Sequence, residues 1–103
     1  MSNLSTQQFM DLKDVGDLHT RDFESIPVKH IDREFFTERG EEPSNYDNLK
    51  KSIAKEGMKK PIQVVKNDHE FPWLYDGHHR AVIAHELGLK KVPVEYLDKD
   101  PDR

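Results

Sequence analysis

Residues 75–81 read Tyr-Asp-Gly-His-His-Arg-Ala and lie between a strand pattern and a helix pattern. Trp73-Leu74-Tyr75 is typical of a short strand, and the residues from His78 to Leu87 predict a helix that Gly88 ends. A strand that passes through glycine straight into a helix leaves the first helical N–H groups unpaired, and the helix dipole adds partial positive charge there. The sequence therefore predicts an anion-binding turn.

The side chains of this turn suit phosphate. Gly77 lets an anion approach the backbone closely, and Arg80 adds a planar fork that can hold two oxygens. His78 and His79 add ring donors. A plainer alternative stays open, in which Asp-Gly is an ordinary turn pair and Arg80 only makes an ion pair. Asp76 also has two open roles, as a ligand for Mg²⁺ on phosphate or as the cap of the following helix.

The clearest other helix pattern covers Ser44 to Glu56, with Gly57 just past its end. Ser44 to Asp47 fits a capping box. Further strands are predicted at Pro61 to Val65 and Val92 to Tyr96, with a turn at Asn67 to Glu70. At least one of the two aromatic residues flanking Leu74 is expected in the core.

The N-terminal part gives weaker patterns. Residues 1–22 are expected to be a leader, in which Ser5 to Val15 forms a short helix or becomes ordered only on a partner. From Phe23 on, apolar residues around Pro27 predict an edge strand or an extended segment. Asp32 to Asn45 predicts an acidic loop with one helical turn, anchored by two adjacent phenylalanines. Residues 23–97 then form the domain, and 98–103 a flexible tail.

The order of predicted elements is strand, helix, strand, strand, helix, strand. It indicates an α+β fold in which helices pack on a small mixed β-sheet. The 103 residues suffice for one domain, and 34% hydrophobic against 35% charged residues indicates a lean core. Because there is no cysteine, a disulfide scaffold, a thiolate zinc site and a catalytic thiol are excluded.

The remaining bulk features bear on partners and location. The formal net charge of -4 argues against a stand-alone DNA binder, since such proteins usually carry a basic excess. No metal-ligand motif occurs among the six histidines. The N-terminus has no signal-peptide pattern and no apolar stretch is long enough to span a bilayer. We therefore expect a cytoplasmic protein without a membrane partner.

Two stretches of the chain resemble the two conserved boxes of the ParB N-terminal domain. The first contains Ser52-Ile53, Gly57, Pro61-Ile62 and Val64. The second contains Tyr75 to Ala81, Ala84, Leu87-Gly88 and Val92-Pro93-Val94. The resemblance covers about Ile26 to Leu97 and implies the ParB/sulfiredoxin fold.

The resemblance also implies a nucleotide site. In this superfamily the glycine-to-arginine turn holds nucleotide phosphates, a role that falls here on Gly77, His78, His79 and Arg80. The loop 57–61 lines the nucleotide pocket in relatives, so Lys59 or Lys60 either neutralises phosphate or belongs to the solvated surface. The implied ligand is ATP, ADP or CTP with Mg²⁺.

This chain departs from the best-known members. Sulfiredoxin has a cysteine where this chain has His78, so its thiol chemistry is excluded. The ParB turn is richer in arginine, and ParB continues into a helix-turn-helix domain and a dimerisation domain. The Asp-Gly-His-His-Arg form is more similar to short phage and plasmid ParB-like nucleases and to free-serine kinases. In those kinases an acidic residue early in the domain is the base, and the acidic loop offers candidates that match no motif closely: Glu34, Glu38, Glu41 and Glu42.

Three functions follow as hypotheses. The first is a nucleotide-phosphate-binding ParB-like domain, acting as a nuclease or NTPase in phage or plasmid DNA metabolism or regulation. In it His79 is the first candidate for proton transfer, and Asp76 is the second catalytic candidate. The second is a small-molecule kinase of the free-serine type. The third is a non-catalytic module that binds DNA or a protein on the same fold.

Overall fold

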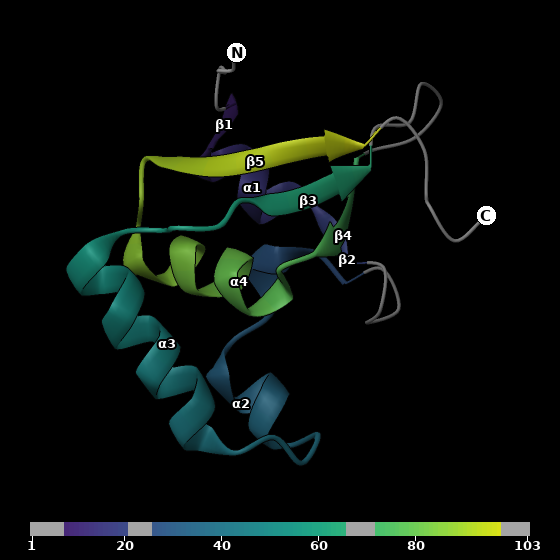
Figure 1. Cartoon of the computed structure of the whole chain (residues 1–103). Helices are drawn as coiled ribbons and strands as arrows, with labels where there is room; N and C mark the ends of the chain where they lie inside the picture. The colour runs from purple at the N-terminus through teal and green to yellow at the C-terminus, as the bar shows by residue number, and fades with distance from the viewer. Residues whose placement is uncertain (1–7, 21–25, 66–71, 98–103) are drawn as a thin grey trace.

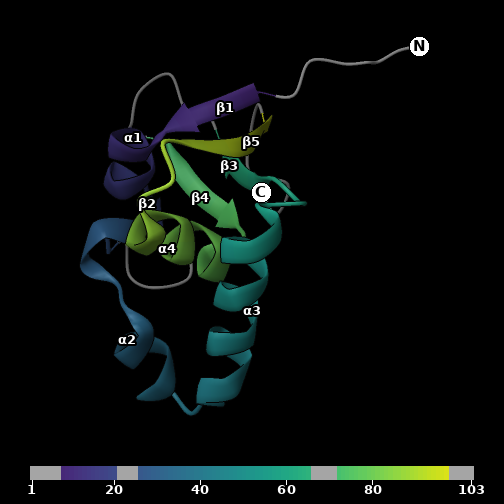
Figure 2. The same cartoon turned by 90° about the vertical axis from the view of Figure 1, so that its left-hand side faces the viewer.

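The computed structural model describes residues 8–20, 26–65 and 72–97. These residues form a mixed sheet of five strands in the order β1-β5-β3-β4-β2, with helix α4 packed on one side of it and helix α3 packed against α4 (Figure 1). Turning the molecule shows α1 beside α4 under the same sheet (Figure 2). The predicted α+β fold with a small mixed sheet is confirmed.

The centre of the sheet is made by β3 (Ile62–Val65) and β5 (Lys91–Leu97), which run parallel. Alternate apolar residues of these strands face the helices and are fully buried, which is the pattern of a sheet with one covered face. Strand β4 (Trp73–Asp76) runs antiparallel to β3. The two edges are β1 (Gln8–Asp11), antiparallel to β5, and β2 (His19–Thr20), parallel to β4.

Helix α4 (His78–Leu87) has the predicted bounds and lies in the middle of the domain. Its residues Ala81 to Ala84 are all buried, because the sheet covers one side of the helix and other helices cover the rest. Gly88 ends the helix in a left-handed conformation with φ of 71°. The buried helix fixes the position of the turn that precedes it.

Helix α3 (Pro43–Glu56) begins one residue before the predicted start and packs against α4. Tyr46 and Ile53 are its buried residues. The Tyr46 hydroxyl donates to the Glu86 carboxylate at 3.3 Å, and burial together with this negative charge raises the pKa of the Tyr46 phenol. Lys50 pairs with the same carboxylate at 2.5 Å.

The predicted capping box at the start of α3 is wrong. Glu42 occupies the N-cap position without a side-chain hydrogen bond, and Pro43 fills the first turn. Asp47 instead accepts hydrogen bonds from Nε and Nη2 of Arg33 at 2.8 and 3.1 Å, which lower the pKa of the Asp47 carboxyl. This bidentate pair ties α2 (Arg33–Thr37) to α3.

The N-terminal segment differs from the predicted leader. Residues 8–11 form the edge strand β1, so a helix from Ser5 to Val15 is wrong there, and α1 (Leu12–Asp17) begins only afterwards. Met10 is buried against the sheet while Phe9 is exposed, an alternation that belongs to a strand. The described part of the segment is therefore built into the sheet and the core. Residues 1–7 lie outside the described residues.

The segment 26–45 is partly as predicted. Pro27 makes one isolated bridge to His19, but a short 3₁₀ turn, η1 (Val28–His30), follows at once, so an edge strand is wrong beyond Pro27. Helix α2 is the one predicted helical turn, and the fully buried Phe36 anchors it. Phe23, the turn 67–70 and the tail 98–103 lie outside the described residues.

The expectation that Trp73 or Tyr75 packs in the core is wrong. Leu74 is the fully buried residue of β4, and its two aromatic neighbours are half-buried on the other face of the strand. In the described ranges, no helix has the length and apolar character needed to cross a membrane.

Candidate functional site

The predicted anion turn is present at the junction of β4 and α4. Gly77 has a φ of 91°, in the left-handed region that favours glycine. The first helical hydrogen bond is donated by the Ala81 amide to the Gly77 carbonyl at 2.8 Å. The amides before Ala81 cannot bond within the helix, so they point out of its N-terminal end, where the dipole is positive.

Arg80 lies folded back over this turn. A Cβ atom added at Gly77 would stand only 2.9 Å from Nη2 of Arg80, so the guanidinium rests against the turn itself. Its Nε is buried without a hydrogen-bond partner among the described residues. The nearest acceptors of Nη2 are the Pro61 carbonyl at 3.4 Å and the Asp76 carboxylate at 3.9 Å, both longer than an ordinary hydrogen bond. The cation thus keeps unused donor capacity at the N-terminal end of α4.

His79 belongs to the first turn of α4 and contacts two residues of the α2 region. Its ring stacks on Phe36 with centroids 4.2 Å apart and planes inclined by 25°. Its Nε2 lies 2.5 Å from Oε1 of Glu41. Each side chain of this pair is 38% exposed, so solvent reaches both. The turn therefore has a histidine that is fixed in place and still accessible.

His78 and Asp76 lie in different surroundings from each other. His78 is only 8% exposed, so its side chain belongs to the interior and its place at the turn is through its backbone. The Asp76 side chain is 66% exposed at the end of β4. Gly77 is the N-cap residue and no side chain caps α4, so the prediction that Asp76 caps this helix is wrong. Its carboxylate remains available beside Arg80.

The two predicted lysines are exposed in the loop before β3. Nζ of Lys59 pairs with the Glu56 carboxylate at 2.5 Å, while the side chain stays 71% exposed. Lys60 is also exposed. The loop reaches the turn through Pro61, whose carbonyl is the one that faces Arg80. The loop before β3 therefore lies next to the turn. The charge of Lys59 is paired with the Glu56 carboxylate.

No group of three or more metal-ligating side chains occurs within residues 8–20, 26–65 and 72–97. A protein-only metal centre is therefore not formed there. A hard cation carried mainly by the oxygens of a bound phosphate needs fewer protein ligands, and one exposed carboxylate is enough. Asp76 is the residue of the turn that fits this requirement.

Sequence reasoning missed the contacts that hold His79. Phe36 and Glu41 come from the acidic loop, and Glu41 is 38 residues away from His79 along the chain. Glu41 was one of four acidic residues considered, and no local pattern separates it from the others. The aromatic pair that anchors the loop was the only signal that this segment packs near the core.

Comparison with known protein families shows which family the chain belongs to. The model of the ParB N-terminal domain matches residues 13–101. The chain belongs to this family. The matched region contains the turn and the loop before β3, and it starts just after β1. A curated relative, an uncharacterized protein of Methanocaldococcus jannaschii, is 43% identical over 49 residues, which is 45% of this chain and 18% of that protein.

Solved structures share the fold of this ParB family member. Sulfiredoxin from Arabidopsis thaliana superposes with a TM-score of 0.60 at 18% identity, covering 93% of this chain and 88% of that chain. The truncated chromosome-partitioning protein ParB from Caulobacter crescentus, complexed with CTP-γ-S, gives a TM-score of 0.63 at 18% identity, covering 94% and 47%. A Pnob8-like ParB-N domain gives 0.58 at 23% identity, covering 99% and 34%. At these identities the likeness establishes the fold alone.

The chain spans less than half the length of either ParB structure and 18% of the curated relative. Activities and partners of those longer proteins therefore do not pass to this chain with the fold.

Proposed function

We propose that this chain binds a nucleotide through its phosphates at the first turn of α4. The observation that carries the proposal is Arg80, whose guanidinium lies over Gly77 with a buried, unpartnered Nε. A buried donor without a partner is costly, and a phosphate oxygen would satisfy it. The turn amides, whose partial charges make up the positive end of the helix dipole, would attract an anion together with the Arg80 guanidinium.

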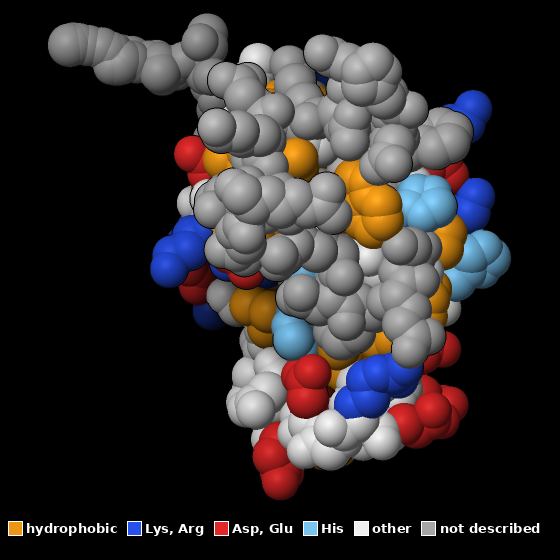
Figure 3. Space-filling model, turned by 90° about the vertical axis from the view of Figure 1, so that its right-hand side faces the viewer, with side chains coloured by type: hydrophobic (Ala, Val, Ile, Leu, Met, Phe, Trp, Pro, Cys, Tyr) orange, Lys and Arg blue, Asp and Glu red, His pale blue; other side chains and the backbone are white. Residues whose placement is uncertain are grey.

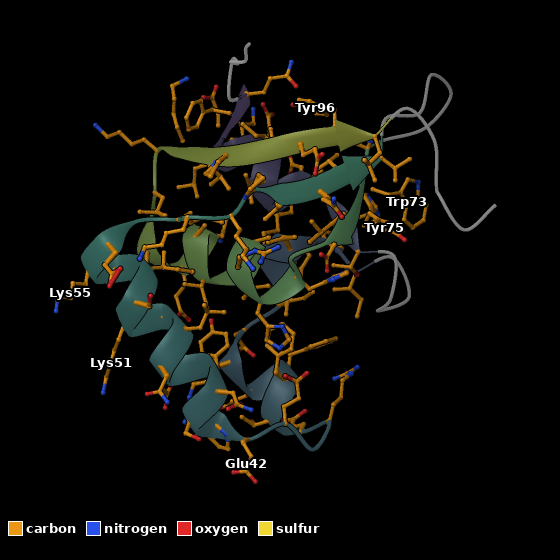
Figure 4. The ribbon with its side chains drawn as sticks, in the orientation of Figure 1. Glu42, Lys51, Lys55, Trp73, Tyr75 and Tyr96 are labelled. Carbon is orange, nitrogen blue, oxygen red and sulfur yellow. The ribbon has the colours of Figure 1, made fainter. Side chains whose placement is uncertain are left out.

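Family membership supports a nucleotide rather than a simple anion. A structural relative, ParB from Caulobacter crescentus, was solved with CTP-γ-S. The candidate ligands are accordingly ATP, ADP and CTP. Of the half-buried aromatic residues of β4 (Figure 4), Trp73 already has its ring against His19, with centroids 6.1 Å apart, and Tyr75 lies two residues before the glycine of the turn.

Mg²⁺ would accompany the nucleotide. The residue that would hold it is Asp76, whose exposed carboxylate lies beside the Arg80 guanidinium. The ion would supply neutralisation of phosphate charge.

The finer parts of the proposal are hydrolysis of a nucleotide or of a phosphodiester, and a role in phage or plasmid DNA metabolism. Charge on the surface weighs against DNA as a ligand of the turn. Acidic side chains gather at the end of the molecule where α2 and the start of α3 lie (Figure 3). Lys51 and Lys55 point outward from α3, away from α4 (Figure 4). A free nucleotide fits this setting better than a phosphate backbone.

Calorimetric titration tests the proposal. Wild type is titrated with ATP, ADP and CTP, each with and without Mg²⁺, and so are Arg80→Ala and Arg39→Ala. Arg39 is the matched control, because its guanidinium is already engaged 3.5 Å above the Phe35 ring. We expect saturable binding that Arg80→Ala weakens about tenfold or more and Arg39→Ala leaves unchanged. Absence of binding by folded wild type would refute the proposed function.

A further inference from the structure

The Glu41–His79 pair is held in place by backbone hydrogen bonds on the Glu41 side and by ring stacking on the His79 side. The Phe36 carbonyl accepts hydrogen bonds from the amides of Arg39 and Glu41 at 3.1 and 3.2 Å, so Glu41 is tied to the same residue on which His79 stacks. Phe36 itself is fully buried. The sharp bend between them is made at Gly40, with a φ of 89°. The Glu41 carboxylate and the Phe36 ring, which both contact His79, are therefore held in a fixed position relative to each other.

The contact between Glu41 and His79 by itself adds little stability. An ion pair whose two side chains are each 38% exposed contributes only about 0–1 kcal/mol. A carboxylate next to an anion site also opposes phosphate binding, and this end of the molecule is already acidic (Figure 3). A negative group placed there, and aimed at a histidine of the phosphate turn, points to a role in the chemistry of the ligand.

The contact with Glu41 favours one ring nitrogen as the donor. An ionised carboxylate can only accept, so in a neutral imidazole the 2.5 Å contact would place the hydrogen on Nε2 of His79. Nδ1 would then be the ring nitrogen that can accept a proton. Nδ1 is also the ring nitrogen nearer to the backbone, and the backbone of His79 belongs to the first turn of α4. The candidate proton acceptor therefore belongs to the same helical turn as the amides that would bind phosphate.

We propose that Glu41 is a positioning residue that holds His79 as the general base for hydrolysis of a bound nucleoside triphosphate. This inference rests on the proposed function. The pair follows the general arrangement in which a base is oriented by a third group on its far nitrogen. Among the acidic residues of the loop, Glu42 cannot replace Glu41, because it lies at the start of α3 and points away from α4 (Figure 4).

The step balances with water as the only co-reactant. The oxygen of water bonds to the terminal phosphorus while one of its protons passes to Nδ1 of His79. The bond from that phosphorus to the bridging oxygen breaks, and the electron pair leaves on the nucleoside diphosphate. Nδ1 then releases its proton to solvent. The products are the diphosphate, inorganic phosphate and one proton. Arg80 and the turn amides stabilise the charge on the transferred group.

Phosphate release from ATP and CTP with Mg²⁺ tests the inference on the full chain. We expect His79→Gln to lower kcat about a hundredfold or more. Glu41→Ala should lower kcat by about tenfold or more with KM almost unchanged, and Glu41→Gln, which keeps the shape and removes the charge, should behave alike. Adding Glu41→Ala to His79→Gln should cost nothing further, because Glu41 acts through His79. Glu42→Ala is the matched control and should match wild type.

A second readout follows the ring itself. Nitrogen NMR at a pH where His79 is neutral should show the hydrogen on Nε2 in wild type, and loss of this preference in Glu41→Ala. Wild type that binds nucleotide but releases no phosphate would overturn the inference and leave the proposed function intact. So would full kcat in Glu41→Ala, or a ring with its hydrogen on Nδ1. If wild type binds no nucleotide, both proposals fail together.

Discussion

Gly77 meets two structural demands at one position. Its backbone is left-handed, and Nη2 of the Arg80 guanidinium lies 2.9 Å from where a Cβ atom would be. The first demand follows from the local sequence, because Asp-Gly before a helix pattern predicts such a turn. The second is visible only in the structure, since it depends on how Arg80 folds back from the following turn.

Substitution of Gly77 by alanine separates these two demands. Gly77→Ala should lower the free energy of unfolding by about 1–2 kcal/mol through the backbone strain. Because Nη2 of Arg80 is the end of a flexible side chain only 2.9 Å from the new Cβ, it should move away, and nucleotide binding should be lost. Urea unfolding and calorimetry measure the two effects.

Gly88→Ala is the control for this prediction. Gly88 has a φ of 71° at the other end of α4, and nothing lies within 4 Å of its missing Cβ. It should keep nucleotide binding and lose less stability than Gly77→Ala, whose added Cβ also meets Cγ2 of the buried Ile62 at 3.0 Å. Equal binding by both variants would show that Arg80 does not act from its position over Gly77.

The sequence predicted only those residues of the candidate site that are adjacent to one another along the chain. Gly77 to Arg80 form one continuous stretch, so their chemistry can be read from adjacent residues. Of the two roles open for Asp76 from the sequence, that of helix cap is wrong because Gly77 itself occupies the N-cap position. The pairing of His79 with Glu41 spans 38 residues, and it depends on Phe36 being buried under α4, which no local pattern specifies.

At the scale of elements, α4 was predicted to the residue and α3 to within one residue. Both have a full helical period and a glycine at the C-terminal end, and such signals are local. The edge strand β2 was missed because it has only two residues. Strand β1 has four residues, as β3 does, but its sequence Gln-Phe-Met-Asp contains no β-branched residue. Strands this short owe their form to pairing with β5 and β4 rather than to their own sequence.

Strand β1 gives a prediction at this scale. Met10 is 7% exposed and Phe9 is 53% exposed on opposite faces of the strand. Met10→Ala should lower the free energy of unfolding by about 2 kcal/mol or more, since it leaves a cavity under the sheet. Phe9→Ala, the matched control on the same strand, should change it by less than about 0.5 kcal/mol.

Urea or thermal unfolding of the two variants measures this difference. A small effect of Met10→Ala, equal to that of Phe9→Ala, would mean that residues 8–11 behave as a separable leader after all.

At the scale of the whole molecule, the fold places three different regions around one turn. The sheet holds the start of α4 through β4, the loop before β3 supplies the Pro61 carbonyl, and the α2–α3 loop supplies Glu41. The bulk composition predicted a single lean domain, and that sufficed for the fold class. It could not predict which loops converge, because convergence depends on contacts between segments far apart in the chain.

The central claim is that a nucleotide binds at the first turn of α4, and NMR titration of the isotope-labelled chain with CTP and ATP tests it most directly. The Nε–H resonance of Arg80 reports the buried donor itself. We predict that this resonance and the amide resonances of His79 and Arg80 shift saturably and with one common Kd. Saturable shifts confined to other residues, with the Arg80 Nε–H resonance unmoved, would contradict the claim.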